Sequence, residues 1–209
     1  ALVTLHNQDI LMLQEMEWSG LQYNTQQSIK DAMRVQAEID GLLIELNALS
    51  PIIPRCWSTD FISQLLYGGV YKWVEKEAYI FTYKDGSTKE KMHNVEKSVE
   101  LPRLVQPPRK ARAKEGFWAT DEATLQKLKT SGVSKKIVDR LLQVREKEKF
   151  VGTYLAGFPK KIGESCWEGG RIHTNYNQVR AVTGRLSSGA PNVQNVPSTQ
   201  KYLFESRYD

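Results

Sequence analysis

The residues best suited to chemistry form one polar run, TGRLSSGAPNVQNVP, at positions 183–197. It holds one arginine, two serines, two asparagines, one glutamine, two glycines and two prolines. Glycine and proline fix turns, and the amide, hydroxyl and guanidinium groups donate and accept hydrogen bonds. Such a run suits the binding of a polar, shaped ligand. The same composition is also typical of a long surface loop, and composition alone does not separate the two.

A second candidate is the basic region that precedes this run. Residues 127–161 carry ten bases against three acids, whereas residues 1–50 carry seven acids against two bases. Arg145 and Lys149 are four residues apart, so a helix places them on one face. Two cations one turn apart can contact successive phosphates of a nucleic acid. They can equally pair with Glu146 or Glu148, or face solvent.

Two long helices are expected before any of these residues. Apolar spacing predicts a helix over residues 2–19 that stops at Gly20, and Asn24 is suited to cap a second helix that ends near Ser50. The short connection predicts that the two helices pack as an antiparallel pair. Ser58 is expected to cap a shorter helix that closes at Gly68.

A β-hairpin and a basic arm follow. Residues 70–99 are rich in β-forming residues around a turn signal at 84–87, which predicts a long hairpin. Residues 101–116 combine prolines with a basic cluster, and both a DNA-contacting arm and a solvated linker are compatible with that composition. Three hairpin lysines can contact DNA or simply face solvent: Lys89, Lys91 and Lys97.

The third part of the chain returns to helix before it reaches the polar run. Thr120 is expected to cap a helix that Gly132 ends, and Ser134 to cap the next. Pro159 is expected to stop that helix and to open a loop over residues 160–170. Residues 171–178 alternate as a strand does. Together these patterns predict an α+β fold that is mostly helical, with long antiparallel helices and a β-hairpin.

Several classes of protein are excluded or disfavoured. No run of apolar residues has the length of a membrane span, and the first residues lack both the pattern of a signal peptide and an initiator methionine. That start predicts a piece cut from a larger chain or a processed product. Cys56 and Cys166 favour a reduced, intracellular protein, and the histidines and cysteines have no zinc-site spacing.

The polar run resembles the TGRLSS…PNLQN signature of family-A DNA polymerases, the bacterial polymerase I type, with Val193 at the leucine position. Other segments resemble that family in the same order along the chain. They are EMEWSGLQY at 15–23, STDFISQLL at 58–66 without the family's proline, WATDEATL at 118–125, REKEK at 145–149 with Thr153 and Tyr154, and His173, Thr174 and Gln178.

The resemblance implies a thumb and the start of a palm. It divides the chain into thumb base helices at 1–69, an inserted hairpin and basic arm at 70–116 of a kind that phage-like members carry, thumb tip helices at 117–162, and the start of the palm at 163–209. It also implies residues that bind primer–template DNA. These are Arg185, Asn192, Gln194 and Asn195 at the minor groove, Thr183, Ser187 and Ser188 at sugar or phosphate, Arg145 and Lys149 at the backbone, and Thr174 and Gln178 beside them.

Physical chemistry agrees with the minor-groove role. The N3 and O2 acceptors of that groove occupy similar places in every correct base pair, so a donor there senses pair geometry without reading sequence. An alternative stays open for Ser187 and Asn192, because short polar side chains in turns often bond to nearby backbone.

The resemblance also implies that the catalytic groups come from polypeptide other than these 209 residues. In the family, palm carboxylates hold two Mg²⁺ ions and a fingers helix grips the incoming dNTP, and neither motif occurs in these 209 residues. The sequence therefore predicts one part of a DNA polymerase, inactive alone, whose catalytic carboxylates lie on a separate chain or a missing part. The alternatives are a non-catalytic nucleic-acid-binding module derived from a polymerase thumb, and an α-rich interaction protein with an accidental signature.

Overall fold

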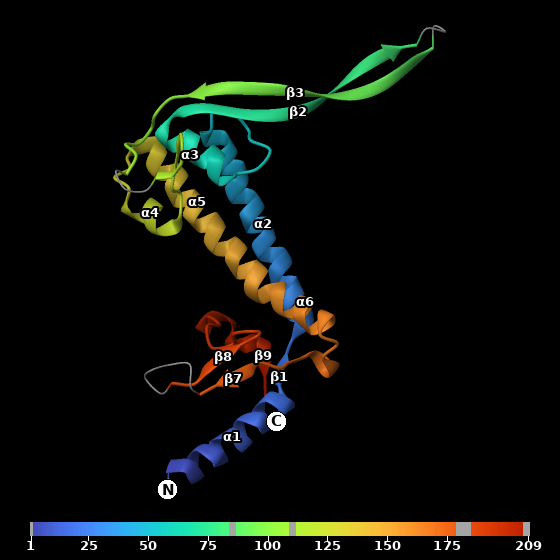
Figure 1. The fold of residues 1–209 in the computed structure, drawn as a ribbon, viewed down its shortest axis with the longest axis vertical. Helices are drawn as coiled ribbons and strands as arrows, with labels where there is room; N and C mark the ends of the chain where they lie inside the picture. The colour runs from blue at the N-terminus through green and yellow to red at the C-terminus, as the bar shows by residue number, and fades with distance from the viewer. Residues whose placement is uncertain (1, 84–86, 109–111, 179–184, 207–209) are drawn as a thin grey trace. The chain divides into compact units, whose positions relative to one another are not determined.

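The computed structural model describes residues 2–83, 87–108, 112–178 and 185–206. The chain divides into two compact units, one of residues 1–41 with 144–209 and the other of residues 42–143 (Figure 1). Helices alternate with small antiparallel sheets, so the predicted α+β class is confirmed. No helix among the described residues is long and apolar enough to cross a membrane. Thr183 and residues 84–86 of the predicted turn lie outside the described residues.

The first unit contains the polar run. Its elements are α1 (Leu2–Ser19), β1 (Leu21–Tyr23), the first part of α2 (Thr25–Leu49), the end of α5 (Gly132–Phe150), the π-helical turn Val151–Leu155, α6 (Gly157–Glu164), the 3-10 turn Glu168–Gly170, β6 (Arg171–Ile172), β7 (Asn175–Asn177), β8 (Ser187–Gly189), the 3-10 helix Ser198–Leu203 and β9 (Phe204–Glu205). Strand β1 lies between β6 and β9 in an antiparallel sheet, and β7 pairs with β8.

Tyr23 lies at the centre of this unit. Its buried ring contacts Phe158 and Phe204 edge to face, with centroids 5.5 and 5.2 Å away. Burial raises the pKa of its hydroxyl above the ordinary value of 10.0. The hydroxyl therefore stays protonated, and it shares a hydrogen bond of 2.7 Å with Ser28 Oγ.

The π-helical turn Val151–Leu155 is stabilised from outside its own helix. A π turn displaces the regular pattern of helix hydrogen bonds. The Tyr154 carbonyl accepts a hydrogen bond from Tyr23 Oη at 3.3 Å, and the Leu155 carbonyl accepts one from Ser28 Oγ at 2.8 Å. Helix α6 then begins at Gly157. The predicted stop at Pro159 is wrong, because Pro159 lies in the first turn of α6, where its missing N–H leaves no bond unmade. The predicted loop at 160–170 therefore begins only after Glu164.

We expect Gly157→Ala to lower the free energy of unfolding by about 1–3 kcal/mol. An alanine Cβ at this position would lie 2.4 Å from the Gly152 carbonyl oxygen, a contact with backbone that no rotamer relieves. Thermal melts should show a fall of about 2–4 °C for each kcal/mol lost. Gly152→Ala is the control, because no atom outside its own helix lies within 4 Å of the added Cβ. Equal melting of the Gly157→Ala and wild-type chains would contradict this account of the turn.

The second unit is built on helix α3 (Thr59–Tyr67), which is buried from Phe61 to Tyr67. Its other elements are β2 (Gly69–Thr82), β3 (Thr88–Leu101), β4 (Arg112–Lys114), β5 (Phe117–Trp118) and α4 (Glu122–Lys127), with the end of α2 and the start of α5. The predicted cap is confirmed, because the Phe61 N–H donates to Ser58 Oγ at 3.2 Å. Strands β2 and β3 form the predicted hairpin over fourteen residue pairs.

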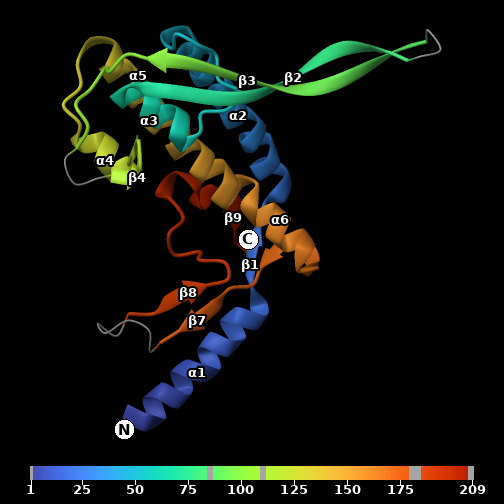
Figure 2. The same ribbon diagram turned by 45° about the horizontal axis from the view of Figure 1, so that its top comes forward.

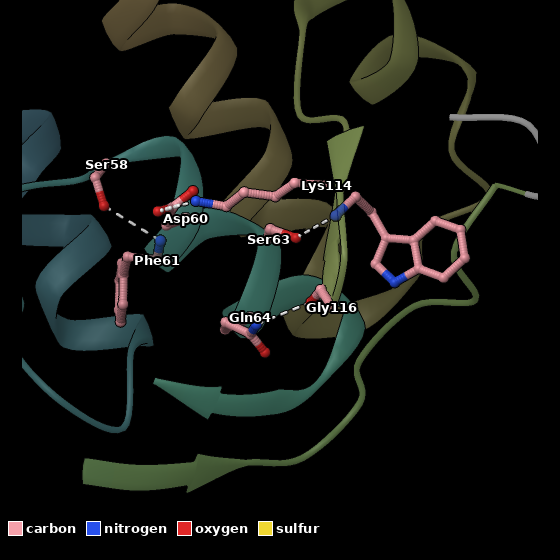
Figure 3. Close-up of polar contacts among 8 residues, drawn as sticks. Ser58, Asp60, Phe61, Ser63, Gln64, Lys114 and Gly116 are labelled. Carbon is pink, nitrogen blue, oxygen red and sulfur yellow. Dashed lines mark hydrogen bonds and ion pairs between the residues drawn. The ribbon is translucent and has the colours of Figure 1, made fainter. Parts of the chain in front are cut away.

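Polar side chains of α3 hold the segment that follows the basic arm (Figure 3). Ser63 Oγ accepts the Trp118 N–H at 2.8 Å, and Gln64 Nε2 donates to the Gly116 carbonyl at 3.0 Å. Lys114 pairs with Asp60 at 2.8 Å. These contacts join residues about 55 positions apart, so they fix the β4–β5 turn against the helix.

The helix boundaries in this region correct three predictions. Asp121, not Thr120, caps α4, since its carboxylate accepts the Thr124 N–H at 3.1 Å, whereas Thr120 is buried. Gly132 does not end α4, which stops at Lys127, but begins α5 with a φ of +54°. Ser134 is not the cap of α5; it lies inside the first turn and donates back to the Ser131 carbonyl.

The antiparallel helix pair also differs from the prediction. Lys147 pairs with Glu38 at 2.6 Å within the first unit, and Arg140 pairs with Glu45 at 2.7 Å within the second. Within each unit, a segment of α2 therefore lies against a segment of α5. Helix α1 does not pack along α2 as predicted but contacts β7, whose Tyr176 N–H donates to the Glu17 carboxylate.

Candidate nucleic-acid interface

The polar loop after β8 is organised by one hydroxyl group. The Ser188 side chain is buried, and its Oγ accepts the N–H groups of Val193 at 3.2 Å and Gln194 at 3.3 Å. The same hydroxyl donates to Asn192 Oδ1 at 3.0 Å, and that oxygen also accepts the Gln194 N–H at 3.0 Å. The Ser188 side chain thus supplies the loop with hydrogen bonds that paired strands would make through their backbones.

Two further side chains close the loop. Gln194 Oε1 accepts the Ser188 N–H at 3.2 Å while its Nε2 donates to the Leu186 carbonyl at 3.0 Å. Thr174 is buried beneath the loop, and its hydroxyl lies 2.6 Å from the Pro191 carbonyl and 3.1 Å from the Gly189 carbonyl. The conformation of the loop is therefore fixed by the protein itself, before any ligand is present.

Tyr154 joins the loop to the helices. Its hydroxyl donates to the Asn195 carbonyl at 2.7 Å, and its ring packs edge to face on Phe158 at 5.6 Å and Phe150 at 6.2 Å. Tyr154 belongs to the π-helical turn between α5 and α6, so the turn sets where the loop lies relative to both helices.

A cavity of about 420 Å³ lies between the loop and these helices, and we call it the loop groove. Its described lining contains two lysines and two asparagines and no Asp or Glu. The lining residues are Lys149, Thr153, Tyr154, Gly157, Phe158 and Lys161 from the helices and Ala190, Pro191, Asn192 and Asn195 from the loop. Two cations and no described anion in the wall of the cavity favour an anionic ligand.

The loop groove gathers three of the residues that the sequence predicted to bind DNA: Lys149, Asn192 and Asn195. Three more lie behind it and hold the loop: Thr174, Ser188 and Gln194. The bonds within the turn do form for Asn192, whereas Ser187 donates to the Asn177 carbonyl of the paired strand β7 at 3.2 Å.

The remaining predicted residues lie outside the groove lining. Arg185 is exposed two residues before β8, and Arg145 is half-buried one helical turn before Lys149. Gln178 lines a different hollow, with Glu17 and Tyr176. Thr183 lies outside the described residues.

Sequence reasoning gave no role to Tyr154 or Lys161. Lys161 was assigned to a loop because Pro159 was expected to stop the helix, whereas a proline in a first helical turn is a known start signal. Tyr154 was part of a family-like segment, but its hydroxyl meets Asn195 only through the tertiary fold.

The predicted Mg²⁺ ions find no ligand set in the described part of the chain. Nowhere in residues 2–83, 87–108, 112–178 and 185–206 do three or more His, Cys, Asp or Glu side chains gather. No step of metal chemistry is assigned to the described residues.

Comparison with known proteins places the chain in a family. The family model of DNA polymerase family A matches residues 76–208, more than half of the chain. The thermostable DNA polymerase I of Thermus thermophilus is 42% identical over 84 residues, which cover 40% of this chain and 9% of that protein. DNA polymerase I of Synechocystis sp. is 38% identical over 99 residues, which cover 47% of this chain and 9% of that protein.

A solved structure has a similar fold. It is the POL domain of Pol1 from M. smegmatis in complex with DNA primer-template and dNTP, with a TM-score of 0.52 at 21% identity over 88% of this chain and 25% of that chain. This chain belongs to DNA polymerase family A. It spans about a tenth of the length of the curated relatives that it matches.

Proposed function

We propose that the chain is part of a DNA-directed DNA polymerase and that the loop groove holds the primer–template duplex. The observation that carries this proposal is the groove itself, where Lys149 and Lys161 lie opposite Asn192 and Asn195 across a preformed cavity. The likeness to a polymerase domain whose structure contains primer-template and dNTP supports the proposal.

Each group has a role that follows from its chemistry. The ammonium groups of Lys149 and Lys161 neutralise phosphates, and Arg145 extends that contact by one helical turn.

Asn192 uses its Oδ1 within the loop, and its Nδ2 makes no hydrogen bond among the described residues, so this donor serves the minor-groove acceptors. Asn195 and Arg185 supply further donors. Both ends of the Gln194 amide are engaged, and we assign Gln194, Ser188 and Thr174 the positioning of the loop.

The reaction needs groups from outside this chain's described residues. We propose that Mg²⁺, its carboxylate ligands and the dNTP site come from polypeptide beyond these 209 residues, on the same chain or a complementary one. A polypeptide that carries them should restore Mg²⁺-dependent primer extension when combined with this chain. Extension by this chain alone would overturn the assignment. DNA copying places the protein inside a cell, in a bacterial cytoplasm if a phage encodes it.

We expect Arg185→Ala to weaken primer–template binding about tenfold, because a guanidinium that bonds to a base edge contributes about 1–3 kcal/mol. Arg185→Lys is the matched variant, since it keeps the charge and removes the planar array of donors. Fluorescence anisotropy with a labelled primer–template measures both. Affinity equal to wild type in Arg185→Ala would remove Arg185 from the interface, and full affinity in Arg185→Lys would show that its charge alone acts.

A further inference from the structure

The β2–β3 hairpin has one face that the duplex groove does not explain. In an antiparallel pair, directly opposite residues lie on the same face. Tyr79 is opposite Lys91 and Phe81 is opposite Lys89, so aromatic rings and lysines share one face of the outer hairpin. Tyr83 continues this face, with its ring 5.0 Å from that of Phe81. We call these five residues the aromatic–lysine face.

The rings of this face are open to solvent. Tyr79, Phe81 and Tyr83 are 37–40% exposed, although aromatic residues usually contribute to a core. Figures 1 and 2 show this end of the ribbon apart from the other elements of its unit. A two-stranded ribbon has no core of its own, so such rings have nothing to cover them within the unit.

One lysine of the face, Lys91, is held beside the rings. Lys91 Nζ lies 3.7 Å from the centroid of Phe81 and 5.2 Å from that of Tyr83, the geometry of a cation–π contact. The described part of the outer face carries no carboxylate. Further in, Glu75 and Glu77 pair with Lys97 at 2.6 and 2.8 Å, which leaves little negative charge to repel an anion.

The base of the hairpin is anchored, so the face has a fixed support. Tyr71 packs on Phe61 of α3 with centroids 4.9 Å apart, and Leu101 is buried. The β2–β3 hairpin is therefore attached to α3 at its base and exposed to solvent in its outer half. Such an arrangement is typical of an arm that presents a surface to a partner.

We infer that the aromatic–lysine face binds single-stranded nucleic acid. Sequence-independent binding of single strands combines a positive track for phosphates with exposed aromatic rings on which bases stack, and this face supplies both. Charge complementarity selects the occupant. The opposite face presents Ile80 and Met92, 74% and 60% exposed, beside Glu90, and that composition suits a protein surface and not a phosphate backbone. The inference goes beyond the duplex groove and does not rest on it.

The test uses the full chain and labelled oligo(dT) and oligo(U) of about 20 nucleotides, longer than one such platform covers. Anisotropy at about 50 mM salt should show binding to both, with equal affinity if stacking and phosphate contact suffice and tighter oligo(dT) binding if the face selects DNA. We expect Tyr79→Leu with Phe81→Leu to weaken binding at least tenfold. The leucines keep apolar bulk and remove the π faces.

Controls separate the face from folding and from the groove. Phe81→Tyr keeps the ring and should keep the affinity, and a melting temperature of the leucine variant equal to that of the wild type shows that its loss of binding is not misfolding. Ile80→Ala with Met92→Ala alters the opposite face and should leave binding unchanged. Lys149→Ala with Lys161→Ala alters the groove, and iodouracil-substituted strands should still cross-link to residues 79–91 in that variant.

Equal affinity of the wild-type and leucine variants would overturn the inference. So would a loss confined to the Ile80 and Met92 variant, which would assign oligonucleotide binding to the opposite face of the hairpin. Because the groove variant is tested alongside, failure of the hairpin and failure of the duplex groove give different results.

Discussion

Ser188→Ala is expected to lower the free energy of unfolding by about 1–3 kcal/mol and to weaken duplex binding about tenfold or more. The substitution removes the hydroxyl that accepts two backbone N–H groups and donates to Asn192 Oδ1. The Val193 N–H then loses its acceptor in a half-buried turn, and a partly buried donor without a partner is costly. Asn192 also loses the bond that fixes its amide, so the loop no longer presents a preformed surface.

Ser187→Ala is the matched control. Ser187 is the neighbouring residue of the same type, and its hydroxyl makes one bond, to the Asn177 carbonyl at 3.2 Å in an exposed setting. We expect its loss to change stability by less than about 0.5 kcal/mol. Chemical denaturation and primer–template anisotropy measure both variants. Equal effects of the two substitutions would show that Ser188 does not organise the loop.

Lys149→Ala with Lys161→Ala is expected to weaken duplex binding by about 10- to 100-fold at low salt, because each lysine that neutralises a phosphate releases a counterion. The two residues lie on different helices, α5 and α6, and meet only across the groove. Both side chains are exposed, so their removal should leave the melting temperature unchanged.

Lys160→Ala serves as the control for charge. Lys160 is adjacent to Lys161, lies outside the groove lining and pairs with Glu164 at 3.7 Å. A general loss of positive charge would affect all three lysines alike. A comparable loss of affinity in Lys160→Ala would therefore assign binding to overall charge and not to the groove.

Local features were predictable from the sequence because few residues decide them. Asn24 was recognised as a cap, and its Oδ1 accepts the Gln27 N–H at 2.9 Å. The long hairpin followed from alternation and a turn signal. At Thr120 and Asp121 two residues are both suited to cap, and burial of Thr120 decided between them, a tertiary fact that local pattern does not contain.

The candidate site was predictable as a set of residues but not as a surface. The signature located Asn192, Asn195 and Lys149, yet which side chains face a ligand and which hold the loop depends on bonds across the fold. Gln194 and Thr174 illustrate this, because their polar groups are engaged by backbone atoms of the loop. Helix α2 was expected to pack against α1 but contacts α5 instead, and the ion pairs between α2 and α5 join residues about 100 positions apart in the sequence.

The salt dependence of primer–template affinity tests the central claim most directly, since its slope counts the phosphates that the protein neutralises. Anisotropy titrations over about 50–200 mM salt should give a logarithmic slope that is shallower by about 1.8 in Lys149→Ala with Lys161→Ala than in the wild type, and unchanged in Lys160→Ala. Equal slopes for the wild type and the double variant would show that the duplex does not occupy the loop groove.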